Sequence, residues 1–332
     1  MNRNKVFIVA EIGNNHEGNF SVAKKMILSA KRCGADAFKF QTFIPGLYVS
    51  VNDKKRFKNL KKFQLSFKEF KQLSIYAKKI KIPFFSTPFD LKSARFLNSI
   101  QKIYKISSGD SNFKPLLKTV ANFNKSIILS TGMTDINTIA QSKKLIFDIW
   151  KKKKKNAKKL IIMHCVSSYP VEKQEANLLA INTLKEKFKD CEIGYSDHTI
   201  GTSAALAAVA LGAQMVEKHF TLSKSYSKFR DHKLSADQDE MRKLVSEIRD
   251  LEKILGSGEK KIQKSEKKAI NYMRRGAVAA VEIPKGKKIS DSDIKWIRIK
   301  NGLKINFEKR IIKRKAKKII KKDKIILKKH LF

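Results

Sequence analysis

The sequence predicts an α/β fold, a (β/α)8 TIM barrel followed by a small C-terminal domain. Eight short apolar segments of strand character each precede a stretch with apolar residues at helical spacing, all within residues 1–255. Polar residues stand at the ends of these strands, where a closed parallel barrel gathers functional side chains. The number of units and their combined length are typical of this barrel, and an open doubly wound sheet is the weaker alternative.

The first strand-helix unit shows the repeating pattern. Residues 6–12 form an apolar run, and residues 21–33 carry Val22, Ala23, Met26, Ile27 and Ala30 at helical spacing. We expect the other strands at residues 37–41, 83–86, 103–107, 126–130, 160–164, 192–195 and 214–217. We expect helices after them at residues 67–80, 91–98, 115–123, 136–150, 177–188, 201–211 and 236–255.

A change in pattern marks the end of the predicted barrel. Gly256-Ser257-Gly258 interrupts the last helical stretch, and a polar segment rich in Lys and Glu follows, so residues 256–275 are predicted to form a linker. Residues 276–332 predict a small second domain. It has strand character at 277–283, a turn at 284–286, a capped helical turn at 290–294 and a second alternating segment at 296–299.

Composition indicates a folded protein of a reducing compartment. Hydrophobic residues make up 42% of the 332-residue chain. The cysteines, Cys33, Cys165 and Cys191, are odd in number and widely spaced, which fits neither a disulfide framework nor a zinc-finger spacing. No apolar run approaches the ~20 residues of a membrane span, and the first apolar run is too short for a signal peptide. We therefore expect a soluble cytoplasmic protein without a membrane partner.

The chain is strongly basic, with 73 Lys and Arg against 30 Asp and Glu and a formal net charge of +43. Such an excess raises the question of nucleic acid or an anionic membrane. Lysine is, however, spread over almost every predicted helix and the run at residues 151–155, rather than gathered around aromatic residues or a nucleic-acid motif. We interpret the charge as solvated lysine faces and expect no specific nucleic-acid partner. The alternative is a basic, non-catalytic barrel that binds nucleic acid or another polyanion.

The polar strand ends predict a ligand site at the barrel mouth. Hydroxyls donate hydrogen bonds to phosphate or carboxylate, and lysine adds compact positive charge, so the set suits a small multiply charged anion such as a phosphorylated carboxylic acid. Its members are Glu11, Lys39, Gln41, Ser86, Thr87, Lys105, Ser107, Ser108, Ser130, Thr131, His164, Ser167, Tyr169, Ser196, His198, Glu217 and His219.

Two histidines at neighbouring strand ends, His198 and His219, predict a divalent metal site beside Glu217. Two imidazoles with open positions for water and substrate suit a borderline metal such as manganese. The alternative is that each histidine is a buried residue satisfied by hydrogen bonds. For His164 there are two alternatives, a place in this site or in the core beneath it. The other histidines have no partner visible in the sequence.

Lys39 and Lys105 lie inside apolar strands, where a lysine is costly to bury without an anionic partner. A bound ligand could supply that partner, and a neighbouring carboxylate such as Glu11 or Asp36 is the alternative for Lys39. Cys165 follows His164, but nothing marks the thiol as activated, so we interpret it as a small buried residue.

At these residues the sequence resembles the sialic acid synthase family, which makes N-acetylneuraminic acid and the related legionaminic and pseudaminic acids. The resemblance covers nearly the whole chain, and residues 283–286 and 297–298 resemble the family's antifreeze-like (SAF) domain. The segments that carry it are Ala10-Glu11-Ile12-Gly13-Asn14-Asn15-His16-Glu17-Gly18, Lys39-Phe40-Gln41-Thr42, Phe85-Ser86-Thr87-Pro88-Phe89, Tyr104-Lys105-Ile106-Ser107-Ser108-Gly109-Asp110, Leu129-Ser130-Thr131-Gly132-Met133, His164-Cys165-Val166-Ser167-Ser168-Tyr169-Pro170, both histidine segments and Asp231-His232.

The resemblance implies condensation of phosphoenolpyruvate with an N-acylated hexosamine, such as N-acetylmannosamine, and release of phosphate. His198 and His219 would hold the metal, with manganese favoured over magnesium or cobalt, and carboxylates near the reacting groups would be Glu11, Asp110 and Glu217. Phosphoenolpyruvate would be bound by Lys39, Thr87, Lys105, Ser108, Ser130, Ser167 and Ser196. The sugar would be oriented by Gln41, Tyr169 and Asp231.

The resemblance also implies a domain-swapped homodimer, in which the small domain caps the partner's barrel and Arg298 reaches the acyl group of the sugar. Three departures from the family pattern stand out. Asp110 replaces a frequent glutamate, Ser167 replaces a frequent asparagine, and Ile299-Lys300 replaces the usual proline and glycine after the arginine. The Lys39-Phe40-Gln41 segment and Asp110 argue against the pseudaminic branch.

Overall fold

The structure is a computed structural model that describes residues 5–153 and 159–332, so Lys154 and Lys155 of the lysine run lie outside the described residues. The chain divides into one compact unit that ends at Ser257 and a second unit, Gly258–Phe332. Each unit is described by itself below. In the part of the chain that the structure describes, no helix is long and apolar enough to cross a membrane.

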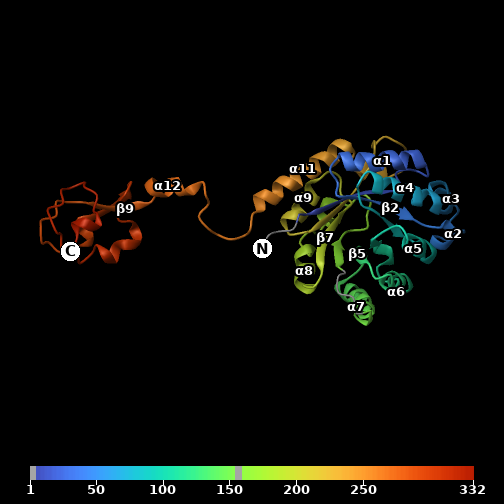
Figure 1. The fold of residues 1–332 in the computed structure, drawn as a ribbon, viewed down its shortest axis with the longest axis horizontal. Coiled ribbons are helices and arrows are strands. Elements are labelled where there is room, and N and C mark those ends of the chain that lie inside the picture. Colours follow the sequence, from blue (N-terminus) through green and yellow to red (C-terminus); the bar gives the residue numbers. More distant parts are fainter. Residues whose placement is uncertain (1–4, 154–158) are drawn as a thin grey trace. The chain divides into compact units, whose positions relative to one another are not determined.

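Among the described residues, eight parallel strands form the sheet of the first unit, in the order β3-β2-β1-β8-β7-β6-β5-β4. The pairing of β1 with β8 joins the first and last strands, which excludes an open doubly wound sheet and confirms the predicted barrel. Helices surround the strands in Figure 1. The strands are β1 (Phe7–Gly13), β2 (Ala37–Thr42), β3 (Phe84–Pro88), β4 (Ile103–Ile106), β5 (Ser126–Ser130), β6 (Leu160–His164), β7 (Glu192–Asp197) and β8 (Met215–His219).

All eight predicted barrel helices are present, with ends that differ by a few residues. They are α1 (Phe20–Arg32), α4 (Phe67–Lys79), α5 (Leu91–Leu97), α6 (Lys114–Asn122), α7 (Ile136–Lys152), α8 (Ala180–Lys187), α9 (Ser203–Ala210) and α11 (Gln238–Leu255). N-terminal capping explains where two of these helices begin. Ser66 and Glu69 form a capping box at α4, and Asp237 accepts hydrogen bonds from two backbone N–H groups at α11.

Short helices in the loops were not predicted from the sequence: α2 (Pro45–Tyr48), α3 (Lys54–Phe63) and α10 (Asp231–Leu234). In α3 only Leu60 and Phe63 are buried and six of the ten residues are lysine or arginine, so the apolar spacing that marks the other helices is nearly absent. Two 3-10 turns, Ser108–Asp110 and Lys173–Glu175, complete the loops at the carboxyl ends of β4 and β6.

The interior of the barrel is layered. Its apolar floor consists of Val9, Ala37, Phe85, Ile128, Ile161, Met163 and Met215, with Phe7 and Ile103 against it. Because alternate residues of a strand face the same side, the inward-facing residues two positions further along are polar in most strands. They are Glu11, Lys39, Thr87, Lys105, Ser130 and Glu217, and this polar layer lies toward the carboxyl ends of the strands.

Strands β3 and β4 end the sheet order, and a side chain joins them. The buried amide of Gln101, two residues before β4, accepts a hydrogen bond from Ser86 N at 2.8 Å and donates one to Ser86 O at 3.3 Å. The amide thereby pairs both backbone groups of a β3 residue, as a neighbouring strand would.

The second unit is small and built on an antiparallel pair. Strand β9 (Arg275–Ala279) pairs with β10 (Ile294–Arg298), and the turn before β10 has the predicted cap, a box between Ser290 and Asp293. The chain enters this unit through α12 (Glu266–Met273), which lies within the segment predicted as a linker. Its core contains Ala277, Ala279, Ile283, Ile289, Ile294, Ile311, Ala316, Ile320 and Ile326.

Candidate active site

Two glutamates and two lysines form a buried charged cluster inside the barrel. The Lys39 ammonium lies 2.8 Å from Glu11 Oε2 and 3.9 Å from Glu217 Oε2, while Lys105 lies 2.7 Å from Glu217 Oε1. None of the four side chains is more than 5% exposed. Of the two carboxylates considered as partners of Lys39, Glu11 lies beside it in the structure, whereas Asp36 pairs with Lys5 and Arg249.

The two glutamates differ in how readily they take a proton. Burial raises the pKa of Glu11 to about 7, although Lys39 opposes the change. Burial also acts on Glu217, but Lys105 and Lys39 together lower its pKa to about 2. At neutral pH, Glu11 is therefore the carboxyl group that can exchange a proton, and Glu217 stays ionised.

Hydrogen bonds hold the cluster in place. Lys39 donates to Thr87 Oγ1 at 2.8 Å, and Ser196 donates to Glu217 Oε1 at 3.0 Å. Gln41 Nε2 donates to Glu11 Oε1 at 3.2 Å. Seven of the predicted site residues, from six strands, are thus connected through one network.

His198 and His219 lie close together above this network, with ring centroids 5.5 Å apart. The backbone carbonyl of Val166 accepts a hydrogen bond from His198 Nδ1 at 2.7 Å, which leaves Nε2 of that ring as the free electron-pair donor. His219 Nδ1 is buried without a hydrogen-bond partner among the residues described. Burial lowers the pKa of both rings, that of His198 to about 4.

These features fit a metal site in which the protein supplies only two ligands. Both rings are neutral at physiological pH, as metal ligands must be, and a backbone carbonyl orients one of them, as is usual for ligating histidines. Within residues 5–153 and 159–332, no group of three or more His, Cys, Asp or Glu side chains could hold a metal ion. Water and substrate would have to fill the remaining positions.

Tyr169 and Asp231 line the same part of the mouth. The Tyr169 ring lies 4.2 Å from the His198 ring and 5.8 Å from that of His219. The Arg230 guanidinium stacks over Tyr169 at 5.3 Å and lies 3.3 Å from Asp231 Oδ1. Burial raises the pKa of Asp231, opposed by Arg230. Two of the predicted sugar-binding residues are thus brought beside the histidine pair.

Predicted phosphate-binding serines converge on the loops after β4, β5 and β6. Ser108 Oγ lies 3.0 Å from the Cys165 thiol and accepts a hydrogen bond from Gly132 N at 3.1 Å. A side chain at Gly132 would come within 2.4 Å of Ser167 Oγ, so only glycine lets these loops approach so closely. A cavity of about 870 Å³ opens beside them, lined by Ser167, Cys165, Thr131 and apolar residues of α7 and α8.

Other predicted residues lie apart from the cluster. Asp110 accepts a hydrogen bond from Ser107 at 2.7 Å, and burial raises its pKa. His164 lies on the outer face of β6, where Ala176 O accepts a hydrogen bond from its Nε2 at 2.8 Å, so of the two alternatives its position favours the core. Arg298 is an exposed residue of the second unit, on β10.

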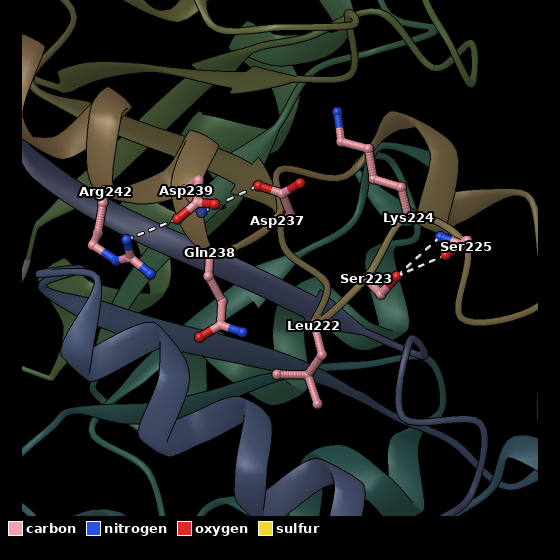
Figure 2. Close-up of a pocket in the computed structure, with 8 residues that line it drawn as sticks. All are labelled: Leu222, Ser223, Lys224, Ser225, Asp237, Gln238, Asp239 and Arg242. Atoms are coloured by element: carbon pink, nitrogen blue, oxygen red, sulfur yellow. Dashed lines mark hydrogen bonds and ion pairs between the residues drawn. The ribbon is translucent and has the colours of Figure 1, made fainter.

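A smaller cavity of about 410 Å³ lies at the start of α11 and contains none of the predicted site residues. Its two cations are already paired: Arg242 with Asp239 at 2.8 Å, drawn as a dashed line in Figure 2, and Lys224 with Glu240 at 2.6 Å. We therefore do not assign an anion site there.

One residue of the network was missed from the sequence. Asn14 is buried after β1 and donates to Gln41 Oε1 at 2.8 Å, which fixes the amide that in turn donates to Glu11. Its position in a run of polar residues directly after an apolar strand is the pattern that identified the other strand-end residues, and would have found it.

Barrel and strand-end residues together place the chain among the (β/α)8 enzymes whose chemistry takes place at the carboxyl ends of the strands. Residues 26–260 match the NeuB family, and residues 274–331 match the SAF domain. The chain belongs to the NeuB family, the family of sialic, legionaminic and pseudaminic acid synthases, which confirms the resemblance seen in the sequence.

Two bacterial synthases match over almost their full length. The chain is 40% identical to the N,N'-diacetyllegionaminic acid synthase of Campylobacter jejuni, covering 97% of this chain and 99% of that protein. It is 36% identical to the pseudaminic acid synthase of the same species, covering 96% and 94%. The crystal structure of N-acetylneuraminic acid synthetase from Leptospira borgpetersenii in complex with citrate aligns with a TM-score of 0.74 at 39% identity, covering 81% of this chain and 91% of that one.

Proposed function

We propose that this protein condenses phosphoenolpyruvate with an N-acylated hexosamine to give a nine-carbon 2-keto-3-deoxy sugar acid and phosphate. The observation that carries the proposal is the buried cluster of Glu11, Lys39, Lys105 and Glu217 beside two neutral histidines, one of which a backbone carbonyl orients. Membership of the NeuB family, whose relatives are named as synthases of such acids, supports it.

Phosphoenolpyruvate would bind through the two lysines and the hydroxyls around them. Lys39 and Lys105 provide compact positive charge for carboxylate and phosphate, and the surrounding hydroxyls donate hydrogen bonds. These hydroxyls belong to Thr87, Ser108, Ser130, Ser167 and Ser196. Because Glu11 is the carboxylate paired with Lys39, an incoming anion competes with it for Lys39 and so raises the pKa of Glu11 further.

The sugar would lie across the histidine end of the mouth, against Gln41, Tyr169 and Asp231. His198 and His219 would hold a divalent metal ion, manganese first and magnesium or cobalt as alternatives. When bound there, the ion would polarise the aldehyde of the open-chain sugar. Arg298, from the second unit of a partner subunit, is proposed to contact the acyl group.

The reaction requires a carbon–carbon bond and three proton transfers. C3 of phosphoenolpyruvate attacks the aldehyde carbon, whose oxygen takes a proton, and water adds at C2 and loses one. Cleavage of the C2–oxygen bond to phosphate, with transfer of the remaining C2 hydroxyl proton to the departing phosphate, then leaves the ketone. Glu11, with a pKa of about 7, can both give and take a proton at neutral pH, while ionised Glu217 keeps Lys105 in position. Asp110 is the third carboxyl group proposed near the reacting atoms.

Within this class we propose a 2,4-diacetamido hexose as the sugar, which leads to a legionaminic-type acid. The identity to the diacetyllegionaminic acid synthase, 40% over nearly the full chain, supports this branch over the pseudaminic one at 36%. N-acetylmannosamine and its 6-phosphate are the alternatives.

The test is phosphate release from phosphoenolpyruvate with Mn²⁺, Mg²⁺ or Co²⁺ across these sugars, with mass analysis of the products. Release with the 2,4-diacetamido hexose and a product one pyruvate unit heavier is expected. Silence with every sugar and metal, from folded protein that binds random DNA in a salt-dependent manner, would instead favour the polyanion-binding alternative.

A further inference from the structure

A second buried ion pair lies directly behind the histidine pair, on the outer face of the same two strands. Asp197 and Lys218 immediately precede His198 and His219, and their side chains point away from the barrel interior into the layer beneath the helices. Lys218 Nζ lies 2.9 Å from Asp197 Oδ2, and the two side chains are 1% and 0% exposed. The two residues are also register partners, the last pair of the β7–β8 ladder.

Further hydrogen bonds saturate this pair. Asp197 Oδ1 accepts hydrogen bonds from Thr199 N at 2.9 Å and from Thr199 Oγ1 at 2.8 Å, and the Tyr195 hydroxyl approaches it at 3.3 Å. Lys218 also donates to Thr199 O. The backbone of His198 is therefore held between Asp197 and Thr199, two residues tied to the strand that carries His219.

Stability alone does not account for this arrangement. A fully buried ion pair is often no more stabilising than well-packed apolar residues, so what it can add is a defined geometry. Here the ion pair joins Asp197 to Lys218. The residues that follow them, His198 and His219, must keep a fixed separation from each other. His198 lies just past the end of β7 and has no partner in the β7–β8 ladder. Its carbonyl accepts a hydrogen bond from Val171 N at 3.0 Å, and the contacts of Asp197 and Thr199 hold the backbone on either side of it.

We propose that Asp197 and Lys218 are positioning residues that fix the spacing and orientation of His198 and His219 for a divalent metal ion. This inference rests on the proposed function, in which the two histidines hold that ion. Contacts one step removed from the ligands typically change metal affinity by roughly 10- to 100-fold when lost.

The experiment measures Mn²⁺ binding to chelator-stripped full-length protein by titration calorimetry, together with thermal unfolding. Removing one partner would leave an unpaired buried charge and threaten folding, so the main variant is the neutral pair Asp197→Asn with Lys218→Met. We expect about tenfold weaker Mn²⁺ binding. We also expect a lower kcat at limiting Mn²⁺ that returns toward the wild-type value when Mn²⁺ is saturating.

A milder variant keeps the test decisive if the neutral pair does not fold. Thr199→Val removes one hydrogen bond to Asp197 and leaves both charges, and it should weaken Mn²⁺ binding about threefold. The control is Arg249→Leu, which breaks ion pairs with Asp36 and Glu252 at the opposite end of the barrel and should lower the unfolding temperature without changing Mn²⁺ affinity.

Two results are distinguishable. Wild-type affinity for Mn²⁺ in a folded neutral-pair variant, or in Thr199→Val if the neutral pair does not fold, would overturn this inference and leave the proposed function intact. Absence of Mn²⁺ binding to the wild-type protein itself would instead overturn the metal assignment of the proposed function, and this inference with it.

Discussion

At the scale of single residues, the barrel interior holds two carboxyl groups that share two lysines unequally. Glu217 has Lys105 at 2.7 Å, Lys39 at 3.9 Å and the Ser196 hydroxyl, while Glu11 has Lys39 alone among the cations within 4 Å in the described structure. Burial acts on both, so the number of cationic partners decides which carboxyl group keeps a proton near neutral pH.

We predict that Glu11→Gln alters the pH dependence of stability. The pKa of Glu11 is raised from 4.5 to about 7 in the folded state, so its contribution to stability is present below about pH 4.5 and is lost as the pH rises through 7. Thermal unfolding at pH 5 and pH 8 measures the free energy of unfolding of both proteins. The value for the variant relative to the wild type should be larger at pH 8 than at pH 5, by on the order of 1–3 kcal/mol. Parallel curves for the two proteins would contradict the raised pKa.

We predict that His219→Ala abolishes condensation, with a loss on the order of 10³-fold in kcat/KM, while the fold is retained. The reason is that the proposed metal site would keep a single protein ligand. The matched control is His164→Ala, since His164 is also a strand-end histidine but contacts Ala176 O outside the barrel interior. Phosphate-release assays and circular dichroism check both variants; equal activity losses in the two would contradict the assignment.

Much of the site could be predicted at this scale, because strand alternation and barrel closure determine which side chains share the mouth. Glu11, Lys39, Lys105 and Glu217 were placed together on that basis, and they are connected in the structure. The pairing of each lysine could not be predicted, because it depends on strand register and on distances between strands far apart in the sequence. The side of the strand on which His164 lies could not be predicted either, because it depends on strand register.

At the scale of elements, the seam between β3 and β4 depends on one amide. Gln101 satisfies both backbone groups of Ser86, which is fully buried. We predict that Gln101→Ala destabilises the barrel by about 2–4 kcal/mol, because it leaves a buried N–H and a buried carbonyl without partners. Urea unfolding measures the loss, and the exposed Gln174→Ala is the control; a change below about 0.5 kcal/mol would show that water replaces the amide.

Helices and strands were predictable where the burial of one face imposes a regular spacing of apolar residues. Every barrel strand and its following helix was placed from apolar spacing, since each must bury one face against the sheet. Helices α2, α3 and α10 were missed because they lie in loops and bury few side chains. The helix α12, in the predicted linker, has no buried apolar stripe that would have revealed it.

At the scale of the whole molecule, the open question is which subunit completes each site. Arg298 is exposed on β10 of the second unit, while the proposed sugar site lies in the barrel. The family resemblance predicts a homodimer in which this arginine enters the partner's barrel. Mass photometry should then show a species of twice the 38.0 kDa chain mass.

Mixing two inactive variants tests the exchange directly. His219→Ala removes a proposed metal ligand but keeps Arg298, and Arg298→Ala keeps the barrel site but loses the arginine. If the arginine acts across the dimer, a mixed dimer contains one complete site, so an equimolar, fully exchanged mixture should recover about a quarter of wild-type activity. If the arginine acts within its own chain, no subunit pairing yields a complete site. Activity no higher than that of the separate inactive variants, from dimers shown to have exchanged, would therefore contradict an arginine that acts across the dimer and would place Arg298 in the site of its own subunit.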